Sequence, residues 1–259
     1  PGYLMKPFIQ IFDVISIPSY NLLAGLGIVT GMLFFERDAR RYLTDPTDYY
    51  LPIVITVILS FGGAVLLQWY LESGIHRGGA GFSMTFYGGL ITGVAVFSII
   101  SRIMGKEVLH SLNLFTPSLA IAHAFGRIGC FLAGCCYGSP SGTAPGVVYP
   151  TGSLPWMRYG AIPIHPVQLY EAGGLVLLFC ALALFRKGFH YRFSIYAVTY
   201  GILRFALEFL RGDDRGILFE SIPLSPAQII SIVFVVSVLI IMIGEKKIRS
   251  NLNLQGLSS

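Results

Sequence analysis

The chain has 259 residues, of which 54% are hydrophobic and only 12% are charged, and its mean hydropathy is +0.69. A soluble domain carries about 25% charged residues, so this composition excludes an ordinary soluble protein and indicates a helical membrane protein. The formal net charge of +5 comes from basic residues spread over short segments, which argues against nucleic-acid binding.

Seven apolar stretches each have about the length that crosses roughly 30 Å of hydrocarbon. Because a helix satisfies its own backbone hydrogen bonds in lipid, we predict an all-α bundle of about seven transmembrane helices, forming a single integral membrane domain over 1–259. The predicted spans are approximately 14–35, 50–71, 84–101, 117–136, 166–186, 193–211 and 225–244.

Lysine and arginine in the segments between these spans predict the orientation. Alternate segments place eleven of the 18 basic residues on one side and five on the other. Basic segments stay in the cytoplasm. We therefore predict an outside N-terminus, a cytoplasmic C-terminus, and an outside loop at about 137–165.

The fourth span contains the unusual stretch H-A-F-G-R-I-G-C-F-L-A-G-C-C-Y-G, from His123 to Gly138. Its arginine, Arg127, would lie at bilayer depth, which costs several kcal/mol unless the charge is paired, hydrated or bound to a ligand. A guanidinium offers a planar fork of donors suited to phosphate or carboxylate. The stretch therefore predicts an intramembrane anion site.

The sixth span carries a second polar face, formed by Tyr200, Arg204, Glu208 and Arg211 at helical spacing. In one interpretation Arg204 and Glu208 form an i, i+4 pair that ties the bundle together. In the other, Arg204 faces the same cavity as Arg127, and Glu208 orients it.

Other polar residues lie at the outer ends of spans. His165 begins the fifth span, where free N–H groups and a partial positive charge are expected, and Gln168 and Tyr170 follow in its first turns. His165 is either a structural hydrogen-bonding residue or a group that transfers protons. Tyr20 and Tyr87 are either interfacial anchors or members of the site.

The cysteines allow three interpretations. Cys130, Cys135 and Cys136 are small buried apolar residues, a source of a disulfide near the oxidising outer face, or a nucleophile or set of metal ligands. The adjacent pair matches no simple zinc pattern. Cys180, in the middle of a span, is interpreted as a packing residue.

Several motifs, in order along most of the chain, together resemble the prolipoprotein diacylglyceryl transferase family. G-R-I-G-C-F-L-A-G-C-C-Y-G is similar to a family signature that begins G-R-I-G-N-F. F-Y-G-G-L resembles F-H-G-G-L, and H-P-V-Q-L-Y-E resembles H-P-S-Q-L-Y-E. Y-G-I-L-R-F-A-L-E-F-L-R and S-P-A-Q-I-I-S resemble the patterns Y-G-x-x-R-F-x-x-E-F-x-R and S-x-x-Q-x-x-S.

The resemblance implies a multi-pass enzyme of the bacterial cytoplasmic (inner) membrane. The family moves a diacylglyceryl group from phosphatidylglycerol to the thiol of the lipobox cysteine of a prolipoprotein, and glycerol phosphate leaves. The implied partners are these two substrates and membrane lipids, without nucleic acid. The implied chemistry needs no metal and no organic cofactor.

The resemblance also implies roles for individual residues. Arg127 and Arg204 would bind the phosphate, with Glu208 beside Arg204. Tyr20 and Tyr200 would line the lipid site, and Gly138 would shape the pocket.

The chain departs from the family pattern at three positions. Cys130 stands in place of asparagine, Cys135 in place of glutamate, and Tyr87 in place of the histidine of F-H-G-G-L. A tyrosine with a pKa near 10 is a poor base at neutral pH, so His123 and His165 are candidates for proton transfer.

Three functional hypotheses follow. The first is lipidation of prolipoproteins. The second is a related enzyme that uses phosphatidylglycerol with another acceptor through a cysteine intermediate at Cys130, Cys135 or Cys136. The third is a lipid-binding or transport protein without enzymatic activity.

Overall fold

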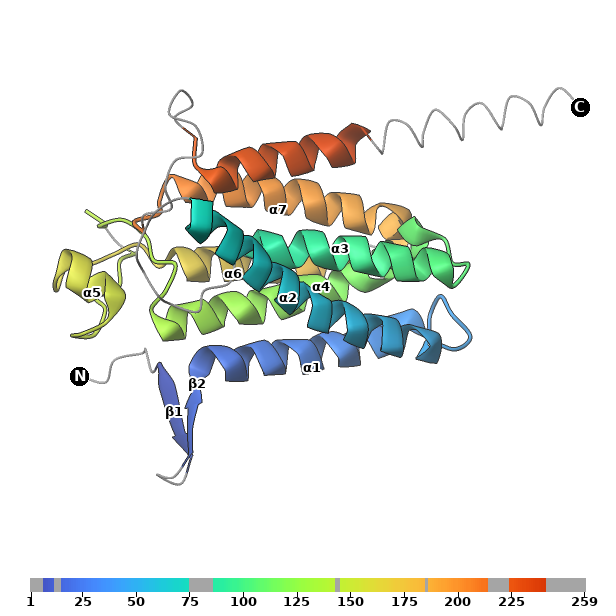
Figure 1. The fold of residues 1–259 in the computed structure, drawn as a ribbon, viewed down its shortest axis with the longest axis horizontal. Helices are drawn as coiled ribbons and strands as arrows, with labels where there is room; N and C mark the ends of the chain where they lie inside the picture. The colour runs from blue at the N-terminus through green and yellow to red at the C-terminus, as the bar shows by residue number, and fades with distance from the viewer. Residues whose placement is uncertain are drawn as a thin grey trace, which may run out of the picture. The chain divides into compact units, whose positions relative to one another are not determined.

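The computed structural model describes residues 7–11, 15–74, 86–142, 145–184, 186–213 and 224–240. A helix occupies each of the seven predicted spans, which confirms the all-α fold class. These helices are α1 (Ser19–Ala39), α2 (Tyr50–Gly74), α3 (Phe86–Ile103), α4 (Val108–Ala133), α6 (Val167–Leu184), α7 (Arg192–Glu208) and a last helix, Pro226–Ile240 (Figure 1).

Three helical stretches in the described part of the chain are long and apolar enough to cross a membrane: Ser19–Ala39, Thr47–Tyr70 and Val167–Leu184. Gly88–Ile103 and Pro226–Ile240 are shorter apolar helices. The number of crossings and their orientation remain predictions.

The N-terminal segment differs from the prediction that a helix begins at about residue 14. Strand β1 (Phe8–Ile11) pairs antiparallel with β2 (Ile15–Pro18), with Phe8 opposite Pro18, and α1 begins only at Ser19. The alternating I-S-I pattern favours a strand, and a residue before proline favours extended backbone. The predicted helix therefore began too early, because the apolar run before α1 contains strand β2 and its proline, Pro18.

Two further boundaries also differ. Helix α4 begins at Val108 and passes through Pro117, where the predicted span began; a proline is tolerated within membrane helices when neighbouring groups satisfy the freed carbonyl. Helix α5 (Leu154–Tyr159) lies within the predicted 137–165 loop, with Pro155 in its first turn and Gly160 at φ +72° after its end.

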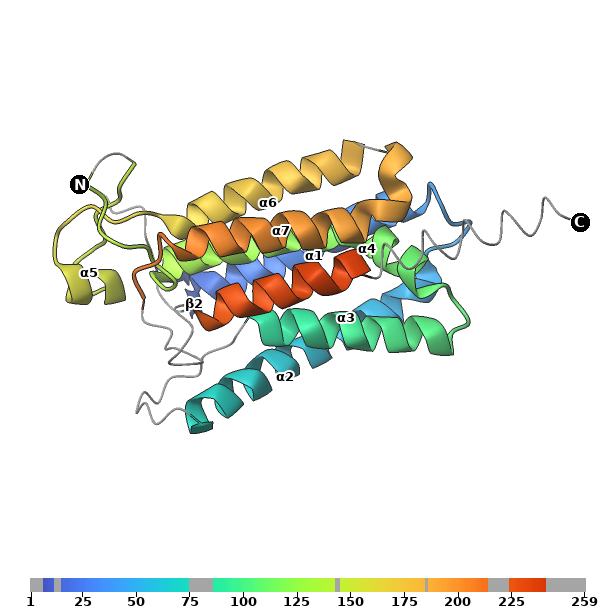
Figure 2. The same cartoon turned by 90° about the horizontal axis from the view of Figure 1, so that it is seen from above.

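The chain divides into two compact units, residues 34–116 and the remainder. In the first unit, a 3₁₀ helix (Thr47–Tyr49) precedes α2, and α2 packs along α3 (Figure 2). The buried rings of this unit belong to Phe35, Tyr49 and Phe97. This division does not test the expectation of a single integral membrane domain.

The second unit contains the β1–β2 hairpin, the N-terminal part of α1, the C-terminal part of α4, α5, α6, α7 and the last helix. A short 3₁₀ segment, Arg186–Tyr191, precedes α7. Glycines allow the helices of this unit to approach closely. A Cβ at Gly27 of α1 would lie 2.9 Å from the Ala122 carbonyl oxygen of α4, and one at Gly174 of α6 would lie 2.6 Å from the Leu203 side chain of α7. These close approaches join α1 to α4 and α6 to α7. The polar residues described next lie on α4, α6 and α7.

Candidate active site

One carboxylate oxygen joins three helices at the centre of the second unit. The Nε of Arg127 (α4) lies 3.0 Å from Oε1 of Glu171 (α6), and the hydroxyl of Tyr200 (α7) donates to the same oxygen over 2.9 Å. Arg127 is 7% exposed, Glu171 1% and Tyr200 0%. The buried charge of Arg127 is therefore balanced by an acid from a different helix, which was absent from the predicted site.

His123 extends this network along α4. Its Nε2 accepts a hydrogen bond from Arg127 Nε over 3.4 Å, and its Nδ1 lies 3.1 Å from the Tyr196 hydroxyl. An imidazole nitrogen that accepts is unprotonated, so Nδ1 carries the proton and donates to Tyr196. The ring also packs edge-on against Tyr200, with centroids 4.8 Å apart, and Tyr200 stacks on Tyr196 at 5.8 Å.

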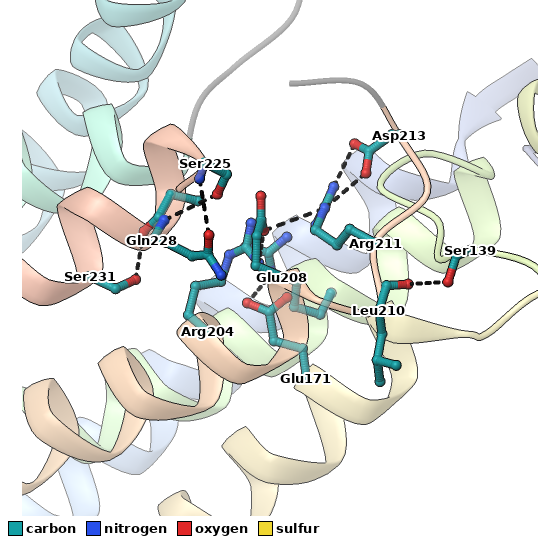
Figure 3. Close-up of polar contacts among 12 residues, drawn as sticks. Ser139, Glu171, Arg204, Glu208, Leu210, Arg211, Asp213, Ser225, Gln228 and Ser231 are labelled. Atoms are coloured by element: carbon teal, nitrogen blue, oxygen red, sulfur yellow. Dashed lines mark hydrogen bonds and ion pairs between the residues drawn. The ribbon is translucent and has the colours of Figure 1, made fainter. Parts of the chain in front are cut away.

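Arg204, one turn after Tyr200 on α7, is 3% exposed and pairs with Glu208. Arg204 Nη1 lies 2.6 Å from Glu208 Oε2, yet among the described residues neither buried atom has an aligned hydrogen bond. The contact is therefore an ion pair without hydrogen-bond geometry. Arg211 Nε lies 3.8 Å from the same Glu208 oxygen, and its main partner is Asp213 (Figure 3).

Gly138 joins three segments at the end of this network. Its N–H donates to the His165 carbonyl over 3.2 Å, and it pairs with Arg211 in an isolated β-bridge. A Cβ at Gly138 would run into the His165 carbonyl oxygen and would lie 2.8 Å from the Val167 side chain. Only glycine fits where these three segments meet.

The predicted residues of the fifth span form a separate group. His165 Nδ1 lies 3.3 Å from the Tyr170 hydroxyl, which donates to the Pro145 carbonyl. Gln168 donates to the Cys135 carbonyl over 2.7 Å and lies 3.3 Å from the Tyr149 hydroxyl. The structure does not place these side chains in direct contact with Arg127. Gln168 instead links Tyr149 of the 137–165 loop to the chain after α4, and burial raises the pKa of Tyr149 to about 12.

Three of the four cysteines gather at the C-terminal end of α4. The Sγ atoms of Cys130, Cys135 and Cys136 all lie within 4.8 Å of one another, and none of the four cysteines forms a disulfide with another. Tyr20 of α1 packs against Gly129, the residue before Cys130: a Cβ at Gly129 would lie 3.2 Å from its ring.

Tyr87 is the second residue of α3, in the other unit, and its side chain lies outside the described residues. Both interpretations of Tyr87, as an interfacial anchor and as a member of the site, therefore stay predictions.

Two residues of the polar network, Glu171 and Tyr196, were absent from the predicted site. Glu171 ends the H-P-V-Q-L-Y-E motif, and Tyr196 lies one turn before Tyr200 on the same face. Helical spacing was the available signal for Tyr196. For Glu171 the sequence offered only the neighbouring motif residues, because its partners lie on other helices.

Comparison with known families and proteins agrees with the motif resemblance. Residues 7–244 match the family described as prolipoprotein diacylglyceryl transferase. The chain is 35% identical over 237 residues to phosphatidylglycerol–prolipoprotein diacylglyceryl transferase 2 of Clostridium perfringens, covering 86% of this chain and 88% of that protein.

Two further relatives give the same picture. The phosphatidylglycerol–prolipoprotein diacylglyceryl transferase of Clostridium tetani is 31% identical over 221 residues, covering 82% of this chain and 88% of the relative. That of Finegoldia magna is 29% identical over 250 residues, covering 90% and 93%. The match extends over all the helices that position the polar network, and the chain belongs to the prolipoprotein diacylglyceryl transferase family.

Proposed function

We propose that this chain is a multi-pass enzyme of the bacterial cytoplasmic membrane that transfers a diacylglyceryl group from phosphatidylglycerol to the lipobox cysteine thiol of a prolipoprotein. The acceptor thiol gives up its proton to solvent, and its sulfur forms a bond to the glycerol carbon of the diacylglyceryl group. The bond from that carbon to the phosphate oxygen breaks, and glycerol phosphate leaves with the electron pair. The product is a thioether.

The observation that carries this proposal is the buried Arg204 guanidinium. Its Nη1 lies 2.6 Å from Glu208 Oε2 without the alignment of a hydrogen bond, and Arg211 Nε lies 3.8 Å from the same oxygen. A phosphate oxygen would offer Arg204 the aligned acceptor that this carboxylate does not. Arg204 lies one helical turn from Tyr200, whose hydroxyl shares Glu171 with Arg127, so one phosphate near these groups would meet charge from two helices.

Two fixed guanidinium groups suit the bond-breaking step. Negative charge grows on the phosphate as the carbon–oxygen bond breaks, and donors held in place in a dry site stabilise that charge without reorganising. Glu171 and Glu208 hold the two arginines in position. Tyr20 and Tyr200 line the lipid side of the site in this proposal, and Gly138 keeps the outer segment close to it.

Reconstitution tests the activity directly. Purified protein is mixed with phosphatidylglycerol and a lipobox peptide, and peptide, lipid and enzyme are analysed by mass spectrometry. The control peptide has serine in place of the lipobox cysteine. We expect the cysteine peptide alone to gain a diacylglyceryl group as glycerol phosphate is released.

Two other results contradict this proposal. Consumption of phosphatidylglycerol with both peptides unmodified, or a lipid adduct on the enzyme, would indicate another acceptor. No consumption by a protein that remains monodisperse and binds phosphatidylglycerol vesicles would indicate lipid binding without transfer.

A further inference from the structure

The three thiols at the end of α4 are brought together by the way the helix ends. The Gly134 N–H donates to the Phe131 carbonyl, the Cys135 N–H donates to the Cys130 carbonyl over 3.1 Å, and Gly134 has φ +73°. These are the two hydrogen bonds and the left-handed glycine of a Schellman motif. In that motif the residue after the glycine folds back over the residue five positions earlier. The usual apolar contact between those positions is here a contact between two cysteines.

The third thiol is held in place by strained backbone. Cys136 has φ +60° and is the one non-glycine residue in the described segments with positive φ. That conformation costs roughly 1–2 kcal/mol for a residue with a Cβ, and such strain concentrates at functional sites. The turn therefore directs a third sulfur toward the first two, at an energetic cost that packing of a small apolar side chain does not explain.

The sulfur positions suit a thiophilic metal ion. Ligands about 2.3 Å from a tetrahedral zinc ion lie about 3.8 Å apart, and the three Sγ atoms already lie within 4.8 Å of one another. Side-chain rotations that bring the Sγ atoms about 1 Å closer together give the spacing of zinc ligands. Cys135 and Cys136 are only partly buried, which leaves an entry path.

Nearby positive charge suits three thiolates. Zinc with three thiolates carries a net charge of −1. Cys130 lies three residues after Arg127 on the same helix face. Arg127 is already paired with Glu171, so its guanidinium lowers the cost of the residual charge without neutralising it.

We infer that Cys130, Cys135 and Cys136 form a zinc-type metal site whose fourth coordination position takes the acceptor thiol as a thiolate. The second half of this inference rests on the proposed function. Among the described residues, no fourth histidine, cysteine or carboxylate joins the group, and catalytic zinc sites keep such an open position. This departs from the expectation, drawn from the family resemblance, that no metal is required.

The chemistry fills the gap left where Tyr87 replaces the histidine of F-H-G-G-L. A thiol coordinated to zinc is deprotonated outright. The acceptor thiol would take the open position and release its proton to solvent. Its sulfur then forms the bond to the glycerol carbon while the phosphate leaves with the electron pair, and the neutral thioether, a weaker ligand, departs.

Cobalt binding tests the metal site without relying on turnover. Co²⁺ is titrated into the purified full chain under a phosphine reductant, and sulfur-to-cobalt charge-transfer absorption is recorded. We expect one equivalent to bind, and Zn²⁺ to displace it. Cys130→Ser, Cys135→Ser and Cys136→Ser should each weaken binding on the order of a hundredfold. Cys180→Ser, at an exposed thiol in α6, is the matched control and should bind as the unmodified protein does.

Alkylation gives a second measurement that needs no variant. Zinc should protect Cys130, Cys135 and Cys136 from iodoacetamide, while Cys180 reacts at the same rate with and without metal, as counted by mass spectrometry. Absence of thiolate–cobalt absorption, or equal alkylation with and without zinc, would overturn the metal site.

The open position is tested by adding the lipobox peptide to the cobalt-loaded protein. A fourth thiolate ligand should shift the visible cobalt bands and intensify the charge-transfer absorption, and the serine peptide should change neither. An unchanged spectrum with the cysteine peptide would overturn the acceptor assignment. Since these spectra do not depend on turnover, a protein that binds cobalt but transfers no lipid would contradict the proposed function alone, and an active protein without metal binding would contradict only this inference.

Discussion

Arg127 on α4 and Glu171 on α6 form a buried ion pair, with 3.0 Å between Nε and Oε1, and Tyr200 on α7 donates to the same carboxylate oxygen. A charged pair in a membrane bundle needs such a complete set of partners, because hydrocarbon offers none. The pair therefore both holds the three helices together and orients the guanidinium that we propose binds phosphate.

Loss of either buried arginine should stop transfer. We expect Arg127→Ala and Arg204→Ala each to lower kcat by at least about a hundredfold, since removing one donor from a preorganised anion site has that effect. The reconstituted assay with lipobox peptide measures it. Arg40→Ala is the control: Arg40 is exposed and pairs with Glu36 at the surface. Full activity in both buried-site variants would remove the phosphate-binding role.

Neutralising Glu171 should destabilise the fold strongly. Glu171→Gln leaves the buried Arg127 without its counter-charge, and breaking a buried pair in this way costs about 3–5 kcal/mol. Unfolding in mixed micelles, followed by circular dichroism, measures the loss. Glu36→Gln disrupts only the pair with exposed Arg40 and should cost less than about 1 kcal/mol. Equal stability of the two variants would show that the Arg127–Glu171 contact contributes little.

Gly138 should tolerate no side chain. In Gly138→Ala the new methyl group collides with the His165 carbonyl and the Val167 side chain, so we expect a loss of about 1–3 kcal/mol or more together with loss of activity. Gly126→Ala is the matched control, because nothing lies within 4 Å of a Cβ there. A Gly138→Ala protein as stable as the Gly126→Ala protein would mean that the three segments can separate without consequence.

The turn at Gly134 should control the thiol cluster. Gly134→Ala places a Cβ at φ +73°, which costs roughly 1 kcal/mol and loosens the hydrogen bond that folds Cys135 over Cys130. We expect cobalt binding to weaken by about fivefold, which corresponds to that cost. Gly105→Ala has the same kind of strain at φ +68° but lies in the other unit. The Gly105→Ala protein should lose similar stability and bind cobalt as the unmodified protein does. An equal loss of cobalt affinity in the Gly134→Ala and Gly105→Ala proteins would contradict the role of the turn.

Tyr149 should make the folded protein less stable in alkali. Burial raises its pKa from 10.0 to about 12, so the folded state favours the neutral phenol. The resulting stability is complete below pH 10 and is lost as the pH rises through 12. Stability measured between these values should fall less steeply in Tyr149→Phe than in the unmodified protein. Tyr191→Phe, at an exposed ring, should leave the slope unchanged.

Much of the fold follows from the sequence alone. Seven apolar runs of sufficient length can satisfy their backbone hydrogen bonds only as helices in lipid, and a helix lies in each of them. The sequence also indicated Arg127 and Arg204 as site residues, because a guanidinium within an apolar run requires a partner. The hairpin before α1 was not predicted, because the four alternating residues of a short strand give a weak signal beside a long apolar run.

The tertiary structure decided which groups meet. Glu171 lies 44 positions after Arg127, and Tyr196 lies 73 positions after His123, so no helical spacing could pair them; only the packing of α4 against α6 and α7 does. The cysteine cluster was likewise open to three interpretations, because composition cannot show that a left-handed Gly134 and a strained Cys136 turn three sulfurs toward one point. Apolar runs determine where the chain enters lipid, whereas the ion pairs and thiol contacts depend on distances between helices that are remote in the sequence.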